Sequence, residues 1–211
     1  MEPEPDRRRV IFVALAIIVV VGIGWAYYAN KKANQAKTAV KPTATVVSNL
    51  TNLDPTDFDS AVKSEYALAI SKASADYKIA TIEVNIDKNM AVDSINTRYI
   101  FSSPSDMINN WMITVAATTQ NYIRALVPKD DYAGDIAPFD TGLWKYNYVT
   151  ALQLAEKAGG LDWRNQNTLS GVKLTLKISG ANSILTWTVE YDSQGQNKTV
   201  VLDATSGKVV E

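Results

Sequence analysis

The side chains that could do chemistry in this chain are carboxylates, lysines, hydroxyls and phenols, because the sequence contains no cysteine and no histidine. This composition excludes thiol nucleophiles, disulfides, Ser-His-Asp and Cys-His constellations and the usual zinc ligand sets. The pair with catalytic spacing is Ser60 and Lys63, in the stretch Ser-Ala-Val-Lys. A lysine one helical turn from a serine can accept the proton of its hydroxyl, as in penicillin-binding acyl transfer.

A second fragment of that acyl-transfer set is Ser94 and Asn96, which form a Ser-x-Asn. The third element, Lys-Thr-Gly, does not occur in the sequence. A solvated helix face therefore explains Ser60 and Lys63 better than catalysis does. We predict no catalytic residues, and no enzyme.

An acidic cluster, Asp54, Asp57 and Asp59, resembles a calcium loop only in composition. An EF-hand loop needs acids at alternate positions, a glycine at the sixth and a glutamate at the twelfth, whereas Pro55 interrupts this stretch. Acids at a helix N-terminus are explained by capping and by the helix dipole. We expect neither a metal nor a cofactor here.

The overall charge of the chain is close to neutral. Its 211 residues include 21 Lys and Arg against 22 Asp and Glu, with a net charge of -1 and a pI of about 5.6. A basic excess is the electrostatic mark of nucleic-acid binding. We therefore expect no nucleic-acid partner.

An apolar run, residues 10–28, is long enough at about 1.5 Å per residue to cross the roughly 30 Å of a bilayer core. Aromatic residues gather at its far end, as in an interfacial belt, and residues 7–9 are arginines. It is longer than an ordinary signal-peptide core, and no Ala-x-Ala follows it. We predict a retained single-pass transmembrane helix in the plasma membrane.

The segments beside this run form a short tail, residues 1–9, and a polar stretch, residues 29–52. The polar stretch is rich in Ala, Thr, Lys and Asn, without sustained amphipathic period, and is predicted to be a flexible tether. Positive charges occur on both sides of the span, so charge alone does not decide the orientation. We expect a cytoplasmic tail and a C-terminal body outside the cytoplasm.

The body contains two helix patterns, one near the start of each half. Asp54 is placed to cap the first helix, with Pro55 at its first position. Asp140 is placed to cap the second, which the pair Gly159-Gly160 stops. The apolar stripes are Val62, Tyr66, Ala69, Ile70, Ala73 and Tyr77 in the first helix, and Trp144, Tyr148, Ala151, Leu152 and Ala155 in the second.

Runs of period two follow each helix and predict four strands in each half. They are residues 80–86, 96–101, 111–116 and 122–127, then 172–179, 185–191, 198–203 and 208–210. Their short connections fit antiparallel hairpins. An ungapped superposition of Trp111 on Trp187 also matches strand parity. We predict an α+β fold of two repeats, each a helix packed on a curled antiparallel sheet, with lobes at residues 53–132 and 133–211.

The last hairpin carries a turn, Asp203 to Gly207. An aspartate can accept a hydrogen bond from its own backbone two residues on, and glycine supplies the positive φ that a tight turn needs. Together with Trp187 in an earlier predicted strand, this turn resembles the signature of the PepSY domain. That signature is a tryptophan within a strand, followed later by Asp-Ala-x-x-Gly-x-Val. Its motif residues stand here as Trp187, Asp203, Ala204, Gly207 and Val209.

The resemblance covers residues 141–211, and the first half departs from it, with Val127-Pro128 where the second has Asp203-Ala204. It implies a cystatin-like, exported and membrane-tethered module that binds or restrains peptidases or senses the envelope. It implies no active site. The motif residues are accordingly expected to be structural.

The tryptophans are the remaining candidates for a ligand or partner surface. Period and position put Trp144 and Trp187 on core faces. Trp163, in a predicted loop beside Arg164, is the candidate for a partner surface. Our hypothesis is a non-catalytic binding or regulatory module that contacts a peptidase or another envelope protein. The alternative is a structural bitopic subunit of an envelope assembly complex; the sequence does not identify a small ligand.

Overall fold

The computed structural model describes residues 50–116, 119, 121–131, 136–179 and 183–210. The predicted tail, transmembrane helix and most of the predicted tether, residues 1–49, lie outside the described residues. Within the described part, no helix is both long and apolar enough to cross a bilayer.

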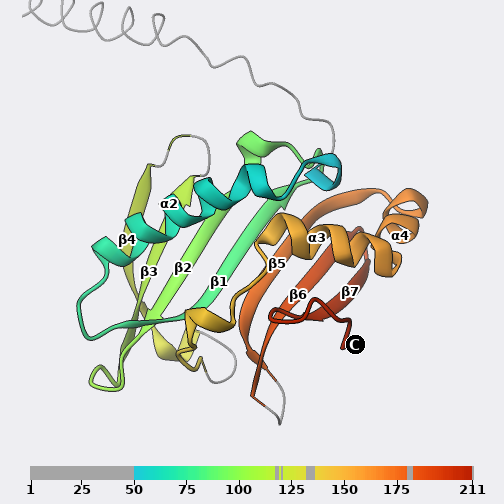
Figure 1. The fold of residues 1–211 in the computed structure, drawn as a ribbon. Coiled ribbons are helices and arrows are strands. Elements are labelled where there is room, and N and C mark those ends of the chain that lie inside the picture. Colours follow the sequence, from blue (N-terminus) through green and yellow to red (C-terminus); the bar gives the residue numbers. More distant parts are fainter. Residues whose placement is uncertain (1–49, 117–118, 120, 132–135, 180–182, 211) are drawn as a thin grey trace, which may run out of the picture. The chain divides into compact units, whose positions relative to one another are not determined.

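One antiparallel sheet forms the centre of the body, with the strand order β4-β3-β2-β1-β5-β6-β7 (Figure 1). The strands are β1 (Lys78–Asp87), β2 (Asn96–Ser102), β3 (Asn109–Ala116), β4 (Tyr122–Pro128), β5 (Leu169–Ser179), β6 (Ile184–Ser193) and β7 (Gln196–Asp203). Within each half, neighbours in sequence pair as hairpins or meanders. The halves join where β1 pairs β5, from Thr81 opposite Lys177 to Asp87 opposite Gly171.

The helices α2 (Thr56–Lys72) and α3 (Tyr148–Ala155) lie across one face of this sheet, α2 over the first half and α3 over the second (Figure 1). After α3 the chain kinks at Glu156–Gly160 (η5), where Gly159 has φ of 101°, and continues as the short helix α4 (Leu161–Gln166). Short turns η1 (Leu50–Asn52), η2 (Val92–Ser94), η3 (Lys129–Asp131) and η4 (Thr141–Leu143) complete the order. The predicted α+β class with antiparallel strands and packed helices is confirmed.

The buried side of α2 differs from the predicted stripe. Phe58, Val62, Glu65 and Ala69 are the buried residues of this helix, whereas Ile70 is 48% exposed. The steps of four, three and four make one helical face. A glutamate thus occupies a core-facing position that a hydrophobic pattern assigns to an apolar residue.

The ends of several predicted elements also move. The predicted tether is shorter than 29–52, because Leu50 is fully buried in the core. Asp140 caps the turn η4, and Asn147 caps α3 by accepting a hydrogen bond from the Thr150 amide at 3.0 Å. The predicted last strand, residues 208–210, is reduced to one bridge between Leu202 and Val209.

The carboxyl of Glu65 lies between α2 and the sheet with no exposed surface. The Tyr99 hydroxyl donates to its Oε2 at 3.2 Å, and its Oε1 has no hydrogen-bond partner. Burial raises the pKa of Glu65 above its usual 4.5, and the hydrogen bond from Tyr99 offsets only part of this. The Glu65 carboxyl is therefore a group whose neutral form the fold favours.

We predict that Glu65→Gln stabilises the protein increasingly as pH rises. Because the pKa of Glu65 is higher in the folded state than in the unfolded state, protonation of Glu65 favours folding. This contribution to the free energy of unfolding is full below pH 4.5 and is lost as pH rises through the folded-state pKa. Glutamine keeps the shape of the neutral carboxyl at every pH. Thermal unfolding of the full chain, followed by circular dichroism, should show a Tm difference from wild type that grows between about pH 4 and about pH 8.

A second variant checks the cause of this pH dependence. In wild type, the Tyr99 hydroxyl donates to the Glu65 carboxylate and thereby lowers the pKa of Glu65. Tyr99→Phe removes this hydroxyl, so the pKa of Glu65 should rise further. Stability should then fall more steeply with pH in this variant than in wild type. A Glu65→Gln difference that stays constant with pH would contradict a pKa raised by burial.

Candidate functional site

A groove lies between α2 and the segment that leads into α3, and we call it the α2 groove. Its volume is about 280 Å³, and it is lined by Asp59, Val62, Lys63, Tyr66, Thr141, Trp144, Lys145 and Asn147. Four of these residues come from α2 and four from residues 141–147, so the groove forms where the two halves of the chain meet.

The aromatic part of the groove is a pair of rings. Tyr66 and Trp144 contact each other edge to face, with ring centroids 5.9 Å apart and an interplanar angle of 89°. Tyr66 also contacts the buried Tyr99, at 6.0 Å between centroids. The Trp144 ring therefore joins the groove to the core through Tyr66.

The backbone around Trp144 is held by two indole donors. The Nε1 of Trp144 and the Nε1 of Trp187 both donate to the carbonyl oxygen of Tyr146, at 2.8 and 2.9 Å. Trp187 is 1% exposed, as its predicted core position requires. Because both indole groups meet the same carbonyl, the wall of the groove is fixed to the centre of β6.

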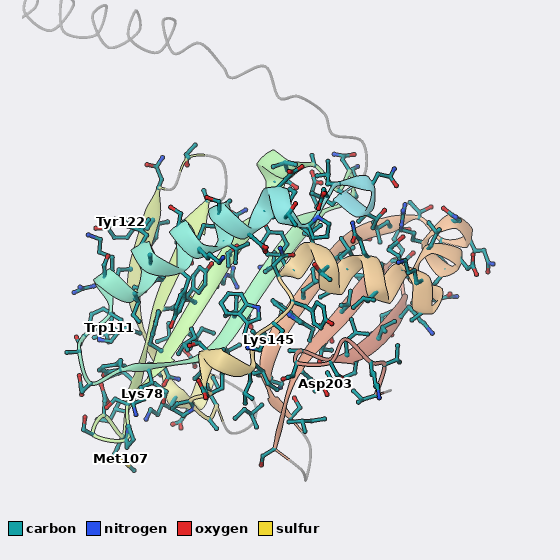
Figure 2. All side chains as sticks on the ribbon, in the orientation of Figure 1. Lys78, Met107, Trp111, Tyr122, Lys145 and Asp203 are labelled. Atoms are coloured by element: carbon teal, nitrogen blue, oxygen red, sulfur yellow. The ribbon has the colours of Figure 1, made fainter. Side chains whose placement is uncertain are left out.

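The turn after β7 supports the same wall from outside. The amide of Lys145 donates to the carbonyl of Ala204 at 3.1 Å, and the Thr205 hydroxyl donates to the carbonyl of Leu143 at 2.8 Å. Figure 2 shows Lys145 and Asp203 in these neighbouring segments. The predicted motif turn therefore positions residues 143–146.

Within this turn, Asp203 and Gly207 have the roles that the sequence predicts. Asp203 Oδ1 accepts from the amides of Thr205 and Ser206 at 2.8 and 3.2 Å, and these bonds lower its pKa, the Thr205 bond most. Gly207 has φ of 72°, and a Cβ there would lie 3.1 Å from atoms of Leu154 and Tyr146. Val209, the last motif residue, is 52% exposed and forms the bridge to Leu202.

On the other side of the groove, the side-chain amide of Asn147 connects the start of α2 to the start of α3. Asn147 Nδ2 donates to Asp59 Oδ1 at 2.8 Å and to the Pro55 carbonyl at 2.9 Å. Its Oδ1 meanwhile caps α3 at Thr150. The beginnings of α2 and α3 are therefore joined through one side chain, which fixes the width of the groove at this end.

The charges left open in the groove are positive. Lys63 and Lys145 are exposed, and neither has an ion pair among the described residues. Asp59, the groove's carboxylate, accepts the Asn147 amide but keeps its negative charge. Two cationic side chains and one anionic side chain therefore line the groove, and the excess favours an anionic group.

The serines of the acyl-transfer hypothesis do not lie in this groove. Ser60 and Lys63 are both exposed on α2, but of the two only Lys63 lines the groove. Ser94 lies in the β1–β2 connection and Asn96 begins β2; the Ser94 hydroxyl donates to the Ala91 carbonyl and the Asn96 side-chain amide to the Ser94 carbonyl. The structure does not bring this set together.

Asp54 and Asp59, from the acidic cluster at the start of α2, each accept a hydrogen bond within the protein. Asp54 Oδ1 accepts from the Thr56 amide at 3.0 Å, and Asp59 accepts from Asn147. In the described part of the chain, no three carboxylates converge as metal ligands do.

The predicted partner surface, Trp163 and Arg164, lies on α4 and packs toward the body. The half-buried ring of Trp163 lies 6.2 Å from that of Tyr191 between centroids. Arg164 Nε donates to both carboxylate oxygens of Glu156, at 2.9 and 3.1 Å. Both side chains therefore pack within the protein, although Arg164 Nη2 has no hydrogen-bond partner among the described residues. Their role as a partner surface stays a prediction.

Sequence reasoning missed the groove itself. Tyr66 and Trp144 were expected in core stripes, and Asn147 and Lys145 had no expected role. An Asn one residue before Tyr148 is a capping signal, but its contact with Asp59, 88 positions away, leaves no local trace.

No family model matches the chain, and no curated protein matches it. Among solved structures, the chain is similar to the crystal structure of a "putative lipoprotein" from Clostridium difficile 630. The identity is 14%, the match covers 78% of this chain and 97% of the other, and the TM-score is 0.47.

We predict that Gly207→Val destabilises the protein by about 1–3 kcal/mol, because valine is strained at positive φ and meets Tyr146 and Leu154. The matched control is Gly195→Val in the β6–β7 turn, where φ is 83° and a Cβ meets no atom within 4 Å. Urea unfolding should show the larger loss for Gly207→Val. Equal losses would mean that backbone strain alone, and not the contact with the groove wall, matters at Gly207.

Proposed function

We propose that this protein is a non-catalytic, single-pass membrane-anchored module that binds and regulates a protein partner at the cell envelope. The partner class is a peptidase or another envelope protein, and the body faces outside the cytoplasm. The observation that carries this proposal is the α2 groove, with its aromatic pair and two lysines that have no ion pair among the described residues. The apolar run of residues 10–28 supports the anchor.

The way the groove is built favours binding over catalysis. Its carboxylate and its amide bond each other, and its indole N–H bonds a backbone carbonyl. A general acid or base must instead present a free group to a substrate. The lining also presents two ammonium groups and aromatic surface, which suit recognition of another molecule.

We also propose that the two halves are copies of one PepSY-like unit. Two such units placed side by side about a twofold axis normal to the sheet would give the strand order β4-β3-β2-β1-β5-β6-β7. In that relation β1 corresponds to β5, β2 to β6 and β3 to β7. The superposition of Trp111 on Trp187 does not fit it, because it places β3 over β6.

A structural role in an envelope assembly complex is the second candidate, and β4 favours it. Among the described residues this strand pairs only with β3, so its outer backbone edge is available to another strand. Tyr122, Ile123 and Leu126 on this edge are 44%, 71% and 50% exposed. An edge of this kind can pair with a further chain.

We predict that a photoreactive amino acid at Thr141 crosslinks a separate protein in intact cells. Thr141 is exposed and lines the α2 groove, so a bound partner would lie against it. Lys157, exposed on η5 outside the groove, is the matched control and should give no crosslink. The products are identified by mass spectrometry.

The position of the crosslink separates the two candidates. Products from Thr141 support binding in the groove. Products only from a photoreactive residue at Ile123 on β4 would replace that proposal with the assembly role. Absence of products at both positions would count against both functions.

We predict that an impermeant protease digests the body in intact cells, with any outer membrane permeabilised first. The readout is loss of a tag fused after Glu211. Lysed cells provide the control for protease sensitivity. A tag protected in intact cells and digested in lysed cells would place the body in the cytoplasm and contradict the proposed orientation.

A further inference from the structure

The polar groups of the α2 groove separate into engaged and open groups. Asn147 and the Trp144 indole N–H are engaged within the protein, and Asp59 accepts the Asn147 amide while keeping its negative charge. The ammonium groups of Lys63 and Lys145 have no ion pair among the described residues. A ligand that pairs the open charges must therefore be anionic.

We infer that the α2 groove binds an acidic side chain of the partner protein together with the apolar residue beside it. Lys63 and Lys145 pair the carboxylate, and the rings of Tyr66 and Trp144 contact the apolar neighbour. This inference rests on the proposed binding function and adds the chemistry of the segment that is bound.

The two lysines approach the groove from opposite walls. Lys63 follows Asp59 by one turn of α2, while Lys145 belongs to the segment that Ala204 and Trp187 hold through bonds to Lys145 and Tyr146. The backbone at Lys145 is fixed, but its side chain is exposed. A carboxylate in the groove therefore meets cations from both sides, and one of them stands on a rigid support.

The aromatic pair supplies the apolar contact. Because the Trp144 N–H bonds Tyr146, this side chain offers a partner its ring surface and not its donor. Tyr66 is half-buried and rests on Tyr99, so it is held in place before a ligand arrives. Preformed aromatic surface of this kind is typical of interface anchors.

The size of the groove favours a peptide segment. A volume of about 280 Å³ is just below the roughly 300–1,000 Å³ of pockets that enclose small molecules. It suits one or two side chains that project from a partner. A phosphate polymer would need a longer track of cations, whereas the groove combines two lysines with two aromatic rings.

The test is selection of phage-displayed heptapeptides on the full chain in nanodiscs of phosphatidylcholine, which carries no net charge. We expect enrichment of Asp or Glu beside Phe, Tyr, Trp or Leu. The double variant Lys63→Glu with Lys145→Glu should bind the selected peptides at least about tenfold more weakly. On this variant, selection should favour Lys or Arg at the same position.

Lys157→Glu makes the matched control, since Lys157 is exposed outside the groove and its reversal should change nothing. Unchanged circular dichroism and Tm of the double variant establish that it folds. Equal binding of acidic peptides by the double variant overturns the inference. So does selection that shows no acidic preference, or binding of inorganic polyphosphate that depends on the two lysines while acidic peptides fail.

These outcomes remain distinct from those of the proposed function. A Thr141 crosslink that persists when Lys63 and Lys145 are reversed retains the binding module and removes only the acidic ligand. If the chain with wild-type Lys63 and Lys145 gives no crosslink from Thr141, the proposed binding in the groove is itself contradicted.

Discussion

The pairing of β1 with β5 is the constraint on which the rest of the body depends. It joins the halves over seven residue pairs, Thr81–Asp87 with Gly171–Lys177, and makes one sheet with one core. Because side chains alternate across a strand, this register puts Ile82 and Val84 on the same face as Leu174 and Leu176. Both helices must then pack on that face, and the groove forms between α2 and the chain that enters α3. A slip of one residue in this pairing would turn one half's apolar face away from the helices.

Local patterns predicted the elements, and tertiary contacts decided the rest. The strands, the α2 start near Asp54 and Pro55, and the positive φ of Gly207 all follow from spacing and turn chemistry. The pairing of β1 with β5 joins residues about ninety positions apart, and alternation alone does not choose such partners. The inward position of Glu65 was missed because a hydrophobicity pattern treats a carboxylate as exposed.

The cap of α3 shows the same limit at a single residue. Asp140 and Asn147 both have capping side chains and both precede apolar residues. Asp140 caps only the turn η4, since the intervening segment is held in a non-helical path by bonds to Trp187, Ala204 and Thr205. The partners of those bonds come from β6 and the final turn. The site was therefore predictable only as far as its scaffold residues, not as a groove.

The entry of the chain into the body has a mechanical consequence. Leu50 is fully buried, and Gln153 of α3 donates to the carbonyls of Thr51 and Leu53 at 3.1 and 2.6 Å. In the proposed anchored protein, tension from the membrane would reach this attachment before it reached the sheet. This attachment involves far fewer contacts than a sheet of seven strands, so its local opening should cost less free energy than unfolding of the sheet. The attachment would then open first, and the segment between the membrane and the body would become longer while the sheet stays folded.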